Sequence, residues 1–334
     1  MGVEAGTARV DAAVADLEGA VAGRGRSGSA SPTALPVGDV AAHLAEAVRA
    51  ALAGVDPLSV RAVVLGTPGI LRFQRGESAA RFAAIWREAG LACPVTVLPD
   101  AVTAFAAGTD RPSGNVLIAG AGAIAARVER EQVTARVDGN GWLVGDDGSG
   151  FWLGRQAVRA VFAALEGRDE HTLLCDAVLA TITAPGRPVP AGCEERKALL
   201  RDAVYDGPPV ALAALAPLVP AAAEAGDRVA HRIVERAVDL LVEAAEPLVG
   251  AEHGEPGGPG GPHEPLVLAG SLMAADGPIR RQVRRRLAER HGRVPLLARP
   301  GAGGALWLAA RRIDRGFGAS AHALFTASGA AVEV

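Results

Sequence analysis

Residues 139 to 154 read Gly139-Asn-Gly-Trp-Leu-Val-Gly-Asp146-Asp147-Gly-Ser149-Gly-Phe-Trp-Leu-Gly154. Glycines at this density let the backbone adopt positive φ and approach a ligand closely. The carboxylates of Asp146 and Asp147 can accept hydrogen bonds from the hydroxyl groups of such a ligand. This composition is typical of a pocket for a small polar ligand, although shorter runs of the same kind also form ordinary turns and helix N-caps.

A helix is predicted directly after this stretch. Apolar residues recur at helical spacing between Arg155 and Leu165, at Ala157, Val158, Val161 and Phe162. The N-terminus of that helix is expected to face the contents of the glycine-rich loop, where its backbone N–H groups favour polar or anionic groups.

Length and composition limit the classes of protein to which this chain can belong. A chain of 334 residues with 49% hydrophobic content is expected to form two domains. Its net charge of -3 gives no signature of nucleic-acid binding or of a membrane surface. Cys93, Cys175 and Cys193 are scattered, which favours neither a zinc site nor a disulfide framework, and a reducing cytoplasm is expected. No apolar run approaches the ~20 residues of a membrane-spanning helix.

Two strand ends carry candidate chemistry in the first third of the chain. A β-hairpin is predicted over residues 10–23, and the apolar strand 61–65 leads to a glycine-bounded turn that contains Thr67. The strand Val95–Leu98 is followed by Asp100 and a predicted helix over Ala101–Ala107. A carboxylate at that junction is placed for a general base and equally for a plain N-cap.

The remaining two thirds alternate between strands and helices. The strand 114–119 runs into Gly120-Ala121-Gly122-Ala123, and the strand 266–269 runs into Gly270-Ser271. Helices are predicted between residues 156 and 250 and over 279–290, where the arginine cluster is interpreted as a solvated face. Residues 251–265 are interpreted as a Gly/Pro surface loop.

The run Gly-Trp, then Gly-Asp-(acid)-Gly-Ser-Gly-aromatic-Trp-(aliphatic)-Gly-Arg, resembles the N-acetylglucosamine kinase branch of the BadF/BadG/BcrA/BcrD ATPase family. The Pro99-Asp100-Ala101 turn adds to the resemblance, which covers nearly the whole chain. It implies an α/β fold of two ribonuclease-H-like (actin-like ATPase) lobes with an inter-lobe cleft. The expected lobes are residues 1–110 and 111–300, and a closing helix at 301–316 is expected to return to the first lobe.

The resemblance also implies roles for individual residues. Asp100 would be the catalytic base, ATP and Mg2+ the cofactors, and Glu4 the metal-associated residue. The sugar would be bound by Asp146, Asp147, Ser149, Thr67 and Ser31. The phosphates and the adenosine would be bound by Gly6, Thr7, Gly120, Gly122, Gly270 and Ser271.

This chain departs from the family pattern mainly in the phosphate loops. The family has Asp-Gly-Gly-Gly-Thr-Lys-Thr where this chain has Glu4 to Val10; an ungapped comparison places Ala8 at the first Thr, and dropping one glycine places Thr7 there. Ala121 and Ala123 replace the hydroxyl residues of the second loop, and Ser271 replaces a glycine. Backbone amides are kept whatever the side chain, so phosphate binding is expected to be weakened but not lost.

The sequence therefore predicts an ATP-dependent kinase that phosphorylates a hydroxyl of an amino sugar, N-acetylglucosamine or glucosamine. The alternative is a sugar-binding or regulatory protein on the same fold with weak or no phosphoryl transfer. An ATP-driven activator of a dehydratase would need cysteines that ligate an iron-sulfur cluster, and the three scattered cysteines argue against it. The expected partner is a small-molecule sugar; a homodimer is compatible with the sequence, which does not fix the oligomeric state.

Overall fold

The computed structural model describes residues 1–30, 35–69, 76–183, 188–249 and 264–329. Its first sheet has the strand order β3-β2-β1-β4-β5. The central strand β1 pairs antiparallel with β2 and parallel with β4. The antiparallel pairing of β2 with β3 confirms the hairpin predicted over residues 10–23. The bounds are β1 (Gly2–Ala5), β2 (Val10–Ala15), β3 (Val21–Ser27), β4 (Val63–Thr67) and β5 (Val95–Pro99).

The second sheet repeats this arrangement. Its order is β10-β9-β6-β7-β8, with β6 antiparallel to β7 and parallel to β9. The strand β8 was missed by the sequence analysis because it lies at the sheet edge and alternates exposed polar residues with half-buried ones. The bounds are β6 (Ser113–Ala119), β7 (Ala123–Glu129), β8 (Gln132–Asp138), β9 (Leu266–Ala269) and β10 (Leu296–Leu297).

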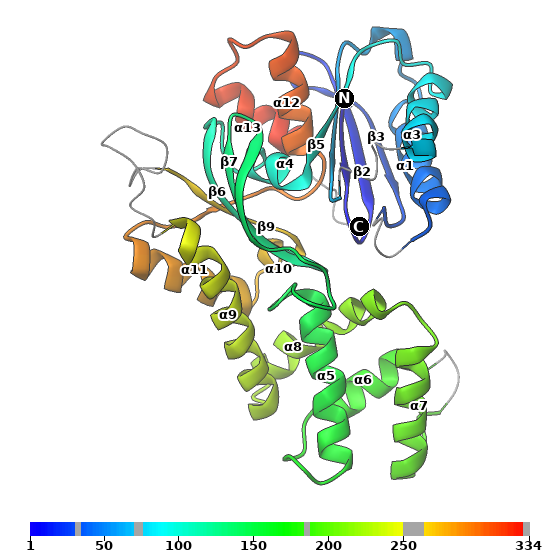
Figure 1. The fold of residues 1–334 in the computed structure, drawn as a ribbon, viewed down its shortest axis with the longest axis vertical. Coiled ribbons are helices and arrows are strands. Elements are labelled where there is room, and N and C mark those ends of the chain that lie inside the picture. The colour runs from blue at the N-terminus through cyan, green and yellow to red at the C-terminus, as the bar shows by residue number, and fades with distance from the viewer. Residues whose placement is uncertain (31–34, 70–75, 184–187, 250–263, 330–334) are drawn as a thin grey trace.

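Two helices lie between the sheets and join the lobes. The helix α4 (Asp100–Ala106) follows β5, and α12 (Gly303–Ile313) comes from the far end of the chain and packs against β1 and β4 (Figure 1). Buried residues of both sheets and both helices form one core cluster, which includes Val64, Phe105, Val116 and Trp307. The α12 backbone approaches β1 so closely that a side chain on Gly2 would collide with it.

The outer face of the first sheet is covered by α1 (Val37–Ala51) and α3 (Gly76–Glu88), as Figure 1 shows. The helix α1 begins after Pro36, and Asp39 lies in its first turn. The helix α13 (Ala319–Ser328), which packs against α12, was not predicted.

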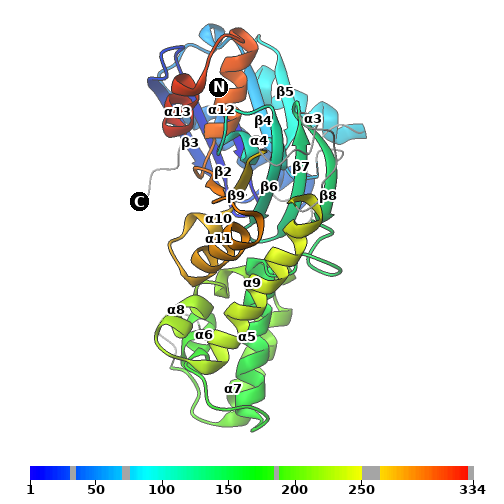
Figure 2. The same ribbon diagram turned by 90° about the vertical axis from the view of Figure 1, so that its left-hand side faces the viewer.

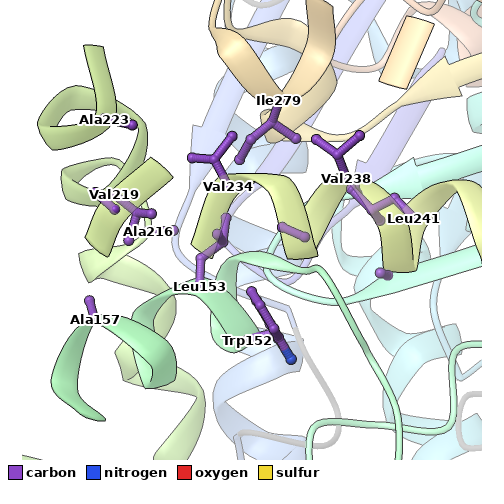
Figure 3. Packing of buried hydrophobic residues seen from close by; sticks show 14 of the residues in the cluster. Trp152, Leu153, Ala157, Ala216, Val219, Ala223, Val234, Val238, Leu241 and Ile279 are labelled. Atoms are coloured by element: carbon purple, nitrogen blue, oxygen red, sulfur yellow. The ribbon is translucent and has the colours of Figure 1, made fainter. Parts of the chain in front are cut away.

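A helical region extends from the second sheet (Figure 2). Its core joins residues of α5, α8, α9 and α11, including Leu153, Val219, Val238 and Ile279 (Figure 3). Within the region predicted to be helical, η2 ends before Pro217 and α8 begins after it, because proline has no N–H for a helical bond. The elements are α5 (Gly150–Leu165), α6 (Leu174–Ile182), α7 (Cys193–Tyr205), η2 (Pro209–Leu215), α8 (Leu218–Glu224), α9 (Arg228–Val249), α10 (Ser271–Ala274) and α11 (Pro278–His291); a further turn, η1, spans Pro57–Ser59.

The strands of the first sheet come from residues 2–99 and those of the second from residues 113–297. The domain limits proposed from the sequence stay a prediction. Most of the predicted surface loop at 251–265 lies outside the described residues. Within the described part of the chain no single helix is long and apolar enough to cross a membrane; one pair, Pro209–Glu224 and Arg228–Val249, meets the length and composition criteria only when taken together across a 117° bend.

The core cluster of the helical region gives a stability prediction. Leu153 is fully buried there, so Leu153→Ala is expected to lower the free energy of unfolding by about 2 to 5 kcal/mol, since it leaves a cavity. Urea denaturation measures this change. The same substitution at Leu58, which is 71% exposed, is the control and should change stability by less than about 0.5 kcal/mol; equal effects would contradict the packing described.

Candidate active site

Glu4 lies on the central strand of the first sheet, directly beside β4. The register pairs Glu4 with Gly66 on β4 and with Asp11 on β2. A side chain on Gly66 would collide with the Glu4 carboxyl and with the hydroxyl of Thr103, so glycine at this position makes room for both groups. The site thus depends on a glycine in the middle of a buried strand.

Burial raises the pKa of Glu4 to about 8. The Thr103 hydroxyl hydrogen-bonds to its carboxyl group and lowers the pKa, and the charges of Asp100 and Asp11 raise it. Asp11 is itself paired with Arg9 at 2.7 Å and with Arg26 at 3.1 Å. The chain therefore holds Glu4 as a neutral acid near pH 7 when no cation is beside it.

Asp100 lies at the junction between β5 and α4, as predicted. Its Oδ1 accepts a hydrogen bond from the backbone N–H of Ala101 at 3.0 Å, and its carbonyl accepts one from the Thr103 hydroxyl at 3.0 Å. Burial raises the pKa of Asp100 to about 6, against the lowering effect of the Ala101 bond. A carboxylate with a pKa close to the working pH suits a general base.

Thr103 connects these two acids. It is 1% exposed, and its hydroxyl lies against the Asp100 carbonyl and the Glu4 carboxyl. Thr103 and Gly66 were not predicted, because only the packing of α4 and the pairing of β1 with β4 bring them to Glu4. Asp11 was not predicted either, since the alternation of β2 gave no functional signal.

The turn between β1 and β2 contains the predicted phosphate residues Gly6 and Thr7. The Gly6 N–H donates to the Arg9 carbonyl at 2.9 Å, which makes the turn tight. The carbonyls of Gly6 and Thr7 accept hydrogen bonds from Ala30 N–H at 3.1 Å and from the Ser29 hydroxyl at 2.5 Å. The segment after β3 therefore fixes this turn through two hydrogen bonds. Ser31, a predicted sugar contact, lies outside the described residues.

The Gly120–Gly122 turn after β6 lies against the start of α5. The carbonyls of Gly120 and Ala121 accept hydrogen bonds from the N–H groups of Gly150 and Phe151, at 2.7 and 3.0 Å. The Ser149 hydroxyl accepts the next N–H, that of Trp152, at 3.2 Å. The first-turn N–H groups of α5 thus bond to protein atoms, and the expectation that they face a ligand is wrong.

Ser149 is the N-cap of α5 and is fully buried. Capping explains why α5 begins at Gly150, earlier than predicted. The sugar-binding role proposed for Ser149 stays a prediction, and its hydroxyl already serves the helix.

Asp146 lies over the Gly120–Gly122 turn. Its Oδ1 accepts a hydrogen bond from Ala123 N–H at 3.2 Å, and a side chain on Gly122 would touch the carboxylate. Burial raises the pKa of Asp146, and the charges of Asp138 and Asp147 raise it further. Asp147 is exposed. The predicted phosphate turn and the predicted sugar carboxylate are thus immediate neighbours.

Gly270 and Ser271 lie beside the same turn. Gly270 has φ +91° and lies so close to Ala119 that a side chain at position 270 would collide with the Ala119 backbone. A side chain on Gly120 would meet Ser271 at 3.7 Å. Three segments that are distant in sequence, around residues 120, 146 and 270, therefore converge at the carboxyl ends of β6 and β9. Thr67 lies on the first sheet, fully buried and paired with Pro99.

Few carboxylates at this site are available to magnesium. Within the described ranges no group of three or more His, Cys, Asp or Glu is arranged to hold a metal ion. The charge of Asp100 acts on Glu4, and Asp11 is paired with two arginines. Mg2+ usually takes one or two carboxylates and completes its shell with water and phosphate oxygens, so Glu4 fits a magnesium ion bound together with a nucleotide.

The raised pKa of Glu4 predicts a pH dependence of stability. The folded chain keeps a proton on Glu4 up to about pH 8, whereas the unfolded chain releases it near the ordinary value of 4.5. The folded state therefore binds more protons, and the free energy of unfolding should fall as the pH rises from about 4.5 to about 8. Glu4→Gln should flatten this slope in urea denaturation in the presence of EDTA. A slope equal to that of the wild type would contradict the burial of Glu4.

Comparisons with known proteins agree with this geometry. Residues 1–309 match the model of the BadF/BadG/BcrA/BcrD ATPase family. The N-acetylmuramic acid/N-acetylglucosamine kinase of Clostridium acetobutylicum is 32% identical over 113 residues, which are 34% of this chain and 36% of that protein. The chain thus matches little more than a third of that relative's length.

Solved structures show the same fold. The protein from Chromobacterium violaceum with the provisional name N-acetylglucosamine kinase has a TM-score of 0.68 at 21% identity, covering 97% of each chain. Its counterpart from Porphyromonas gingivalis has a TM-score of 0.69 at 20% identity, covering 94% of this chain and 98% of that one. The predicted two-lobed fold of the actin-like ATPases and sugar kinases is confirmed, and because the family model spans most of its length, this chain belongs to the BadF/BadG/BcrA/BcrD ATPase family.

Proposed function

We propose that this protein is an ATP-dependent kinase that phosphorylates a hydroxyl of an amino sugar, with N-acetylglucosamine or glucosamine as the substrate. The observation that carries the proposal is Asp100, a half-buried carboxylate with a pKa of about 6 beside Glu4 at the carboxyl end of the first sheet. The name of the Clostridium acetobutylicum relative supports the choice of sugar. The scattered cysteines support a cytoplasmic location.

In this proposal Asp100 accepts the proton of the attacking sugar hydroxyl. The hydroxyl oxygen forms a bond to the γ-phosphorus of ATP, the bond from that phosphorus to the bridging oxygen breaks, and ADP leaves. Asp146 accepts hydrogen bonds from other sugar hydroxyls, since a carboxylate oxygen can accept more than one. Asp147, Ser149, Thr67 and Ser31 are the further sugar residues of the proposal.

The glycine turns serve the nucleotide in this proposal. Gly6, Thr7, Gly120 and Gly122 bind phosphates through the backbone, and Gly270 and Ser271 lie against the adenosine. Glu4 would hold Mg2+, which would neutralise developing charge on the phosphates. Bringing the cation to Glu4 also favours release of its proton, because an opposite charge lowers the pKa of a carboxyl group.

A sugar-binding protein without phosphoryl transfer is the second candidate. Ala8, Ala121 and Ala123 supply no hydroxyl to the two turns, and the Asp146 carboxylate bonds the Ala123 N–H on the turn proposed for phosphate. A phosphate at this position would be repelled by that charge. Titrations with Mg-ATP separate the candidates: binding of the sugar without binding of Mg-ATP, and without ADP formation, would leave only the second.

Asp100→Asn tests the catalytic assignment. Asparagine keeps the shape of the side chain and cannot accept the proton, so turnover should fall about 100-fold to 10,000-fold while the sugar Kd changes by less than about threefold. A coupled ADP assay and calorimetry measure the two quantities. Asp16→Asn is the control, because Asp16 is an exposed carboxylate that also accepts backbone N–H groups, those of Glu18 and Ala20. Strong loss of sugar binding with near-normal turnover would overturn the role of Asp100.

A further inference from the structure

Asp138, the last residue of β8, holds the loop that carries Asp146 and Asp147. Its Oδ1 accepts a hydrogen bond from the Asp146 N–H at 2.8 Å, and its Oδ2 accepts one from the Asp147 N–H at 2.9 Å. Both carboxylate oxygens are therefore used on two consecutive amides. Bonds from N–H groups to an ionised acceptor are about twice as strong as bonds between neutral groups.

The backbone around these bonds adopts an unusual conformation. Asp138 and Asp146 have φ values of +63° and +57°, in the left-handed region that favours glycine. Such a conformation persists where surrounding bonds over-determine it. The adjacent Gly145 makes the contact possible, because a side chain there would collide with Oδ1 of Asp138. The contact between the Asp138 carboxylate and the loop backbone therefore depends on Asp138 itself and on the absence of a side chain at Gly145.

The arrangement brings like charges together. Asp138 and Asp147 both raise the pKa of Asp146, so the repulsion of their charges opposes this geometry. The two hydrogen bonds that Asp138 accepts, from the N–H groups of Asp146 and Asp147, offset that repulsion and fix the backbone of Asp146. With its backbone fixed, Asp146 places Oδ1 on the Ala123 N–H, against the Gly120–Gly122 turn.

We propose that Asp138 is a positioning residue for sugar binding. It fixes the Asp146–Asp147 backbone through the two hydrogen bonds that it accepts, and this holds the Asp146 carboxylate beside the Gly120–Gly122 turn. The inference rests on the proposed function, in which Asp146 binds the sugar. Asp138 itself touches loop backbone and acts through Asp146.

Asp138→Asn is the first test. The carboxamide has one acceptor oxygen, so it can accept only one of the two N–H groups and turns an NH2 group toward the other. Calorimetry with N-acetylglucosamine and with glucosamine should show a Kd about 10-fold higher than in the wild type for the sugar that binds, which corresponds to one charge-assisted hydrogen bond. The Kd for Mg-ATP should stay within about twofold. In the kinase assay the sugar KM should rise more than kcat falls.

The control is Asp227→Asn. Asp227 also accepts two backbone N–H groups, those of Ala230 at 2.8 Å and Leu173 at 2.5 Å, in the helical region. Its loss should lower the thermal midpoint of unfolding and leave the sugar Kd unchanged. Equal weakening of sugar binding by both variants would show a general loss of stability and overturn the inference.

Gly145→Ala is a second, independent test, because it displaces the Asp138 carboxylate and leaves that residue intact. Its sugar Kd should rise like that of Asp138→Asn, and the double variant should be little weaker than either single variant. Gly277→Ala is the control, since Gly277 has open space around it and a negative φ. A wild-type protein that binds neither sugar would overturn the proposed function and this inference together; a wild type that binds sugar while both loop variants bind it equally well would overturn the inference alone.

Discussion

Two half-buried carboxyl groups, those of Glu4 and Asp100, lie together at the carboxyl end of the first sheet, and their environment has to compensate for the loss of water. Gly66 gives them space, Thr103 hydrogen-bonds to Glu4 and to the Asp100 carbonyl, and paired arginines neutralise Asp11 nearby. Burying an acid without a cationic partner raises its pKa, as it does for both groups. Perturbed acids of this kind gather at functional sites, which supports the proposed placement of Mg-ATP beside Glu4.

The second sheet repeats the strand order of the first, but its loops use hydrogen bonds differently. At its carboxyl end the Gly120 and Ala121 carbonyls take up the first N–H groups of α5, and Ser149 takes the next. That bonding attaches the helical region to the sheet, so the sugar contact proposed there rests on side chains, above all that of Asp146. One lobe thus supplies buried acids and the other a carboxylate loop braced by Asp138.

The sequence allowed prediction of features that depend on local patterns. The hairpin, the strand that ends at Asp100 and the glycine turn at Gly120 all follow from spacing and turn chemistry. Thr103 and Gly66 could not be found, because their role appears only when β4 pairs with β1, more than sixty residues away in the chain. Asp138 looked like an ordinary residue before a glycine, since its partners are backbone amides. For Ser149 the sequence offered both a ligand contact and an N-cap, and helix capping is what the structure contains.

The central claim is that Asp100, Glu4 and the Asp146 loop act together to transfer a phosphoryl group to a sugar hydroxyl. The most direct measurement is the fate of labelled γ-phosphate when the protein is mixed with Mg-ATP and N-acetylglucosamine or glucosamine, followed by separation of the products. The account predicts that the label appears on one of these sugars, in an amount equal to the ADP formed. Label found only in unreacted ATP or in free phosphate, while the sugar is bound, would contradict it.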